Sequence, residues 1–192
     1  MNFAERTQVF AEVLDNAVFS GANGEVWQQT DGLKRGIDLL NQAASGDQQV
    51  FVLGNGGSAA VASHIVNDFV NNGRLKAHTL HDPALLTCMT NDYGYENAYA
   101  RILRTQARRG DLLIAISSSG QSGNILEAVR AMDQAGGETM TLSGFRGDNP
   151  LRRAGGLNCW LDKQDYGLVE IGHLFVLHYL IDSFKKAREG EF

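Results

Sequence analysis

Cysteine and proline are scarce in this sequence, and each scarcity excludes a class of protein. The two cysteines, Cys88 and Cys159, lie far apart, at a spacing that fits neither a zinc motif nor a redox motif. Both have apolar neighbours, so we interpret them as small core residues. Only 2 prolines accompany 22 glycines, a balance that favours tight backbone turns over disorder.

A basic surface and a membrane-crossing segment are also missing. The chain carries 17 Lys and Arg against 22 Asp and Glu, and its net charge of -5 argues against a nucleic-acid partner. No apolar run is long enough to cross a bilayer. Residues Met1–Arg6 lack the basic region and apolar core that begin a signal peptide. We therefore expect a cytoplasmic protein with no membrane partner.

Short apolar runs alternate with amphipathic stretches from residue 49 onward. The runs predict strands over 49–53, 77–81, 111–116, 138–143 and 157–161. The amphipathic stretches predict helices over 59–70, 84–89, 96–107, 124–135 and about 168–187. This alternation indicates an α/β fold, with a central parallel sheet of about five strands and helices on both faces.

The segment before residue 49 has helical periodicity and no strand signal. Residues 3–19 and 25–44 predict two helices, separated by a break at Ser20–Gly24. We expect residues 1–46 to form a helical arm and residues 47–192 a ligand-binding domain. The arm has two possible roles, covering the sheet or packing against a second copy of the chain.

The run from Gly110 to Ser122 carries the strongest functional signal. Its apolar strand ends in Ser117, Ser118 and Ser119, and an amphipathic helix begins at Asn124. Such a turn aims backbone N–H groups, hydroxyls and the positive end of a helix dipole at one small volume, which suits an anion. The biological anion that we expect there is a phosphate group on a small molecule.

A second turn of this kind, Gly54–Ser58, follows the first strand of the predicted sheet. Its three glycines allow close approach of a ligand to the backbone, and Asn55 and Ser58 add side-chain donors. The turn lacks the lysine of a P-loop and the glycine spacing of a Rossmann turn, so we expect no nucleotide cofactor. Two such turns at the carboxyl ends of parallel strands predict one shared site.

Five ionisable residues on two predicted helices are candidates for chemistry. His64 and Asp68 share a helix face, as half of a metal site, as an acid–base pair, or as a partly buried histidine bonded to a neighbouring carboxylate. Glu170 and His178 lie about 12 Å apart along the last helix, so one ion cannot bind both in one chain. The second would have to reach a neighbouring subunit. His173 is interpreted as a core or interface histidine.

The remaining histidines and the tyrosines have ordinary structural interpretations. We expect His78 and His81 to be structural or exposed. Tyr93, Tyr95 and Tyr99 are candidates for a binding surface, although packing in the core or at an interface is the default for such residues.

Taken together, these motifs resemble those of sugar isomerase (SIS) domains, which bind phosphosugars. The two turns, the segment Asn91–Asn97 and the final helix with its histidine are most similar to the phosphoheptose isomerase family, and the resemblance covers roughly residues 50–180. It implies a three-layer α/β SIS domain. It also implies a homotetramer whose active sites are shared between subunits.

The resemblance further implies roles for individual residues. The phosphate would be held by the two turns, through Gly56, Gly57, Ser58, Ser117, Ser118, Ser119 and Ser122. The sugar hydroxyls would be contacted by Asn55 and Asp92. His178 matches the catalytic histidine of the family, and His64 matches a histidine of the metal site in some members. Asp68 stands where the family carries a catalytic glutamate, and Glu170 where it usually carries a glutamine.

The activity implied by this resemblance is aldose–ketose isomerisation of a phosphosugar. The expected reaction converts sedoheptulose 7-phosphate to D-glycero-D-manno-heptose 7-phosphate through an enediol, for surface heptose synthesis. Asp68 or Glu170 would be the first base, and His178 its partner. The residue types of His64, Asp68, Glu170 and His178 also suit one zinc ion per site.

Two alternatives stay open because the carboxylates at 68 and 170 depart from the family pattern. One is a non-catalytic SIS module that binds a sugar phosphate as a sensor or scaffold, as a related replication-initiator-binding protein does. The other is an SIS isomerase of a different phosphosugar, in a capsule or nucleotide-sugar pathway.

Overall fold

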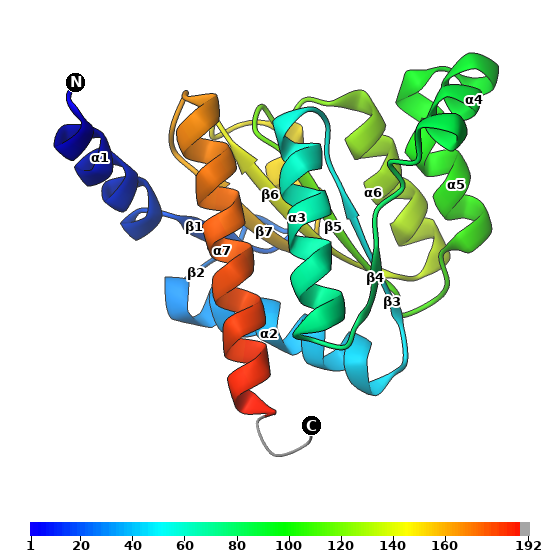
Figure 1. The fold of residues 1–192 in the computed structure, drawn as a ribbon, viewed down its shortest axis with the longest axis horizontal. Coiled ribbons are helices and arrows are strands. Elements are labelled where there is room, and N and C mark those ends of the chain that lie inside the picture. Colours follow the sequence, from blue (N-terminus) through cyan, green and yellow to red (C-terminus); the bar gives the residue numbers. More distant parts are fainter. Residues whose placement is uncertain (189–192) are drawn as a thin grey trace.

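Seven strands form one sheet, and helices cover both of its faces (Figure 1). The computed structural model describes residues 1–188. The strands are β1 (Val18–Ser20), β2 (Val26–Trp27), β3 (Gln49–Leu53), β4 (Lys76–His78), β5 (Leu112–Ser117), β6 (Glu138–Gly144) and β7 (Leu157–Leu161). Their order is β2-β1-β7-β6-β5-β3-β4. Strands β3 to β7 run parallel, whereas β1 is antiparallel to β2 and to β7.

The helices agree with the amphipathic stretches of the sequence to within a few residues. They are α1 (Phe3–Asp15), α2 (Gln29–Ser45), α3 (Gly57–Asn71), α4 (Pro83–Tyr93), α5 (Ala98–Gln106), α6 (Gly123–Ala135) and α7 (Tyr166–Ala187). Two short 3-10 helices, η1 (Tyr95–Asn97) and η2 (Pro150–Arg153), complete the described elements.

Alternate residues of the central strands enter two separate cores. In β3, Val50 and Val52 pack with apolar side chains of α2, α3 and α7 on one face of the sheet. Phe51 and Leu53 of the same strand point to the other face, against α5 and α6. Because a strand alternates its side chains, a sheet covered on both faces needs apolar residues at every position. The predicted three-layer α/β architecture is confirmed.

A hairpin formed by β1 and β2 adds two strands to the five that the sequence predicts. Phe19 of β1 is buried against α2, where a Cβ at Gly32 would lie only 2.2 Å from the Phe19 Cβ. The expected helix over 3–19 therefore ends at Asp15, and the one over 25–44 begins at Gln29. Because β1 pairs with β7, the segment before residue 46 extends the main sheet. The division into arm and domain stays a prediction.

The strand order reverses beside β3, and this reversal fixes where a ligand binds. The chain passes from β3 to β4 on one side and then returns to β5 on the other. The crossovers therefore diverge at the carboxyl ends of β3 and β5, where open α/β sheets form a crevice for ligands. Both turns predicted to bind an anion follow these two strands.

By length and mean hydropathy alone, α7 is able to cross a membrane, which the sequence reading did not expect. Half of that stretch is buried inside the fold, as in the core helix of a globular domain. Residues such as Leu177, Leu180 and Ile181 pack into the first core.

Candidate active site

A cavity of about 240 Å³ lies at the carboxyl ends of β3 and β5. It is lined by Asn55, Gly56, Gly57, Ser58, Ile116, Ser117, Ser118, Ser119, Ser122, Tyr166 and Glu170. The structure thus brings the two predicted turns together around one volume, to which α7 adds Tyr166 and Glu170. We call this cavity the anion pocket.

Two helices begin at the anion pocket without a side-chain cap. Helix α3 starts after Gly56, which has no side chain to cap it. Helix α6 starts after Ser122, whose side chain does not bond the first turn of the helix. The first N–H groups of both helices therefore need another acceptor, and both dipoles present their positive ends to the pocket. Gly56 has a φ of 53°, a conformation that explains the glycine at this position. The arrangement suits a phosphate group.

The serines of the second turn differ in what they bond. The hydroxyls of Ser117 and Ser122 lie 2.9 Å apart and bond each other. Ser118 is only 4% exposed, and its Oγ has no hydrogen-bond partner among the described residues. A buried hydroxyl without a partner is unfavourable, so this serine lacks a polar group that a bound ligand would supply.

Glu170 projects from α7 against the start of α3. A Cβ at Gly57 would lie 2.2 Å from the Glu170 Oε2, so only glycine leaves room for this carboxylate. The positive end of the α3 dipole attracts it. The same charge faces the volume that suits a phosphate, and it therefore disfavours a second anion there.

A pair of asparagines joins the two turns of the anion pocket. Each side-chain amide of Asn55 and Asn124 donates to the carbonyl oxygen of the other, at 2.8 Å in both directions. The Tyr95 hydroxyl donates to the same Asn55 oxygen at 2.7 Å, and the Tyr99 hydroxyl donates to the Gly54 carbonyl at 3.2 Å. Burial raises the pKa of Tyr99 to about 12. The sequence reading missed Asn124 as part of the site, and it named Tyr95 only as a candidate for a binding surface with packing as the default.

A second group of side chains, which we call the His–Asp–His cluster, lies between α3 and α7. The Asp68 Oδ2 is 3.3 Å from the His178 Nδ1, and the rings of His64 and His178 lie edge to face with centroids 5.2 Å apart. One ligand atom from each of the three residues lies within 4.8 Å of the others. His178 and Asp68 are partly exposed, so the cluster is open to small molecules.

The donor atoms of the His–Asp–His cluster fit a zinc ion. Two imidazole nitrogens and one carboxylate oxygen are ligands that zinc takes, and catalytic zinc sites combine three protein ligands with an open position. Glu170 does not join this cluster in its own chain, because it lies against Gly57 in the anion pocket. Of the four residues predicted to share an ion, one chain therefore brings three together.

Asp92 lies outside both groups. It is the penultimate residue of α4, on the surface, where the Cys88 Sγ is 3.6 Å from its Oδ2, and this carboxylate raises the pKa of the Cys88 thiol. Its predicted contact with sugar hydroxyls stays a prediction. Cys88 is exposed, so its interpretation as a core residue is wrong, whereas Cys159 is buried as predicted.

His173 is a core residue, as the sequence reading favoured. It is fully buried, its Nε2 lies 3.1 Å from the Ser143 carbonyl oxygen, and burial lowers its pKa to about 4. His173 is therefore neutral at physiological pH.

Comparison with known proteins agrees with this geometry. The sequence model of the SIS domain family matches residues 22–144. The chain belongs to the SIS domain family. It is 33% identical over 161 residues to the phosphoheptose isomerase of Geotalea daltonii, which covers 81% of this chain and 83% of that protein. It is 30% identical over 184 residues to the phosphoheptose isomerase of Pectobacterium atrosepticum, covering 92% and 91%.

Solved structures show the same likeness. The phosphoheptose isomerase GmhA of Neisseria gonorrhoeae superimposes with a TM-score of 0.80 at 26% identity. The superposition covers 96% of this chain and 95% of that one. This chain and this relative are therefore comparable in extent.

Proposed function

We propose that this protein is an aldose–ketose isomerase of a phosphosugar, with sedoheptulose 7-phosphate as substrate and D-glycero-D-manno-heptose 7-phosphate as product. The similar proteins named above are phosphoheptose isomerases, which supports this substrate pair. The reaction moves a carbonyl group between the first two carbons of the sugar, through an enediol. It needs an anchor for the phosphate and an acid–base pair at the other end of the chain.

The observation that carries the proposal is the placement of these two parts on one helix. The anion pocket lies at the start of α3, and the residues that this helix gives to the His–Asp–His cluster, His64 and Asp68, are seven and eleven residues after Gly57, about 10 and 16 Å along the helix axis. An extended sugar of seven carbons reaches the near end of the cluster from its phosphate, whereas a triose does not. The spacing therefore favours a long phosphosugar with its reacting carbons beside the His–Asp–His cluster.

In the proposed complex, the phosphate accepts hydrogen bonds from the first N–H groups of α3 and α6 and from the serine hydroxyls. Ser118 gains the partner that it lacks among the described residues. These contacts are the same in ground state and transition state, so they contribute to affinity and orientation.

Proton transfer falls to Asp68 and His178. One of the two removes a proton from C1 of the ketose, and the electron pair forms the C1–C2 double bond of the enediol. The same group returns the proton to C2, while its partner moves a proton from the C1 hydroxyl to the C2 oxygen. The two groups are in contact, at 3.3 Å, so each stabilises the charge that the other acquires.

A zinc ion held by His64, Asp68 and His178 would polarise the carbonyl oxygen when bound. We propose that Glu170, the fourth residue of the predicted set, contributes to a metal site only across a subunit boundary.

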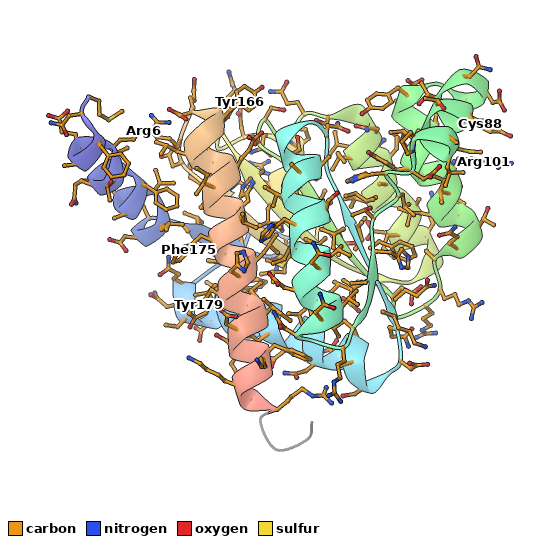
Figure 2. The ribbon with its side chains drawn as sticks, viewed as in Figure 1. Arg6, Cys88, Arg101, Tyr166, Phe175 and Tyr179 are labelled. Carbon is orange, nitrogen blue, oxygen red and sulfur yellow. The ribbon has the colours of Figure 1, made fainter. Side chains whose placement is uncertain are left out.

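An apolar stripe on α7 supports the predicted homotetramer. Ile171, Phe175 and Tyr179 recur every four residues and are 56%, 53% and 47% exposed (Figure 2 shows Phe175 and Tyr179 along α7). Phe10 of α1 packs edge to face on Phe175, at 6.3 Å between centroids. His178 neighbours this stripe, so a second copy packed on it would lie close to the His–Asp–His cluster.

Because phosphorylated sugars are retained inside the cell, we place the enzyme in the cytoplasm.

The test is to incubate the purified protein with sedoheptulose 7-phosphate, with added zinc and with a chelator, and to follow the sugar by NMR. Appearance of the aldose supports the proposal. Tight binding without turnover in both conditions contradicts it, and favours a sensor or scaffold.

A further inference from the structure

We infer that Tyr95 is a positioning residue for substrate binding, which acts by holding Asn55 as a hydrogen-bond donor toward the ligand. The inference rests on the proposed function, since it concerns the same pocket. It starts from the network in which Asn55, Asn124 and Tyr95 bond one another.

The hydrogen bonds of Asn55 determine what it can offer a ligand. Its carbonyl oxygen accepts from the Tyr95 hydroxyl at 2.7 Å and from the Asn124 amide at 2.8 Å, so both lone pairs are engaged. One hydrogen of its Nδ2 bonds Asn124. Its second N–H belongs to a side chain that lines the anion pocket. Asn55 therefore recognises an acceptor oxygen of the ligand and not a donor.

Tyr95 itself lies on the far side of the turn from the anion pocket. A second cavity, of about 290 Å³, is lined by Tyr95, Tyr99 and His81, and shares Asn55 and Gly56 with the anion pocket. The Tyr95 hydroxyl therefore bonds Asn55 from the side of this second cavity, and Tyr95 does not line the anion pocket with the serines. Its effect on a ligand in the anion pocket passes through the Asn55 amide.

The same hydrogen bond ties a loosely packed segment to the turn. Helix α4 has no buried residue, and its C-terminal end leads through Gly94, with a φ of 79°, into η1. Tyr95 is the first residue of η1. Its bond to Asn55 thus holds the end of α4, with Asp92, at a fixed distance from the anion pocket.

The experiment compares Tyr95→Phe with Tyr93→Phe as a matched control. Tyr93 loses the same atom, but its ring is exposed and packs under the Arg101 guanidinium, with the Arg101 Cζ 4.8 Å from the ring centroid. Tyr95→Phe should raise the KM for sedoheptulose 7-phosphate about three- to tenfold with kcat nearly unchanged, which is the range for one hydrogen bond. Inhibition by inorganic phosphate, which the helix N-termini and serines would bind, should change by less than twofold. Tyr93→Phe should change none of these values.

A double-mutant cycle tests whether Tyr95 acts through Asn55. In the Asn55→Ala background, Tyr95→Phe should have no further effect on KM, because the amide that it positions is gone. An equal rise of KM in both backgrounds overturns the inference. So does a loss of phosphate affinity that matches the loss of sugar affinity, which would indicate general damage to the fold.

A measurement without substrate separates this inference from the proposed function. The side-chain NH₂ resonances of Asn55 in a ¹⁵N NMR spectrum should shift with Tyr95→Phe and not with Tyr93→Phe. If the unmodified protein binds no phosphosugar, the proposed function fails. If the Asn55 resonances do not shift with Tyr95→Phe, the inference fails whatever the protein binds.

Discussion

The Asp68 carboxylate lies 3.3 Å from the His178 imidazole, across the contact between α3 and α7. The two residues are separated by more than half the chain, yet their side chains lie in contact beside His64. This contact is the basis of the proposed acid–base pair and of the first prediction.

His178→Ala should lower kcat for sedoheptulose 7-phosphate by about two to four orders of magnitude, which is the usual contribution of one general acid–base group. The KM should change little, because the phosphate contacts are untouched. Asp182→Asn, a change at an exposed carboxylate one turn later on α7, is the control and should retain activity. Near-full turnover by His178→Ala would refute the assignment of this pair.

Ser118→Ala should weaken phosphosugar binding without destabilising the protein. The Ser118 hydroxyl is buried and has no partner among the described residues, so its removal costs the free protein no hydrogen bond. We expect a dissociation constant about three- to tenfold higher, measured by calorimetry, with an unchanged or higher Tm. Ser63→Ala, at an exposed position of α3 outside the anion pocket, should leave the affinity unchanged. A lower Tm with unchanged affinity would mean that Ser118 supports the fold alone.

Glu170→Gln should tighten the binding of inorganic phosphate severalfold. The Glu170 carboxylate lies against Gly57 in the anion pocket, and a neighbouring like charge disfavours the phosphate by an amount on the order of 1 kcal/mol. The gain should shrink at high salt, because screening weakens the repulsion. Glu138→Gln, at the amino end of β6 and therefore at the opposite end of the strands from the anion pocket, should leave affinity unchanged. Weaker phosphate binding by Glu170→Gln would show that the carboxylate helps to build the pocket.

The strands that could be predicted from the sequence are short, mostly apolar runs. β3 and β7 have the predicted bounds, because such short runs between turn residues leave no competing interpretation. The hairpin strand Val18–Ser20 was missed, since three residues are too few to show an alternation and the helical periodicity of the preceding segment continues into them. The two turns of the anion pocket could be recognised because each is a continuous string of mostly glycine or serine residues in the sequence.

The cross-links of the site could not be predicted in this way. Tyr95 and Asn55 are 40 residues apart, and Asn124 and Asn55 are 69 apart, so only the folded sheet brings them together. His64 and Asp68 were predicted to share a helix face, but it is His178, from another helix, that lies against Asp68. The spacing along the last helix showed that Glu170 and His178 lie too far apart to bind one ion in one chain. It did not show where either side chain lies.

The stability of the protein should fall between pH 7 and pH 5, in part because of His173. Burial lowers its pKa to about 4 in the folded state, whereas the unfolded chain has the ordinary value near 6.5. The unfolded state therefore binds the extra proton in this window, so folding loses stability as the pH falls from 6.5 toward 4. We expect His173 to account for about 2 kcal/mol of the loss at pH 5. Urea unfolding of His173→Gln should show a correspondingly smaller pH dependence. An unchanged pH dependence would place the effect elsewhere.

Phe175→Asp should dissociate the proposed tetramer. Phe175 lies in the exposed apolar stripe of α7, and a charge there would be buried without a partner in any interface that covers the stripe. Light scattering coupled to size-exclusion chromatography should give a tetramer for the unmodified protein and smaller species for the variant. Val26→Asp, an equally polar change at exposed Val26 on the edge strand β2, should remain tetrameric. A monomeric unmodified protein would refute the proposed assembly.

The most direct test of the proposed mechanism is the fate of the hydrogen at C1 of sedoheptulose 7-phosphate in deuterated water. The account predicts deuterium at C1 of the recovered ketose and at C2 of the aldose, seen by NMR with the unmodified protein and lost with His178→Ala. Aldose that forms at an unchanged rate with His178→Ala would contradict proton transfer through Asp68 and His178. Binding without exchange or isomerisation would contradict the enzyme itself.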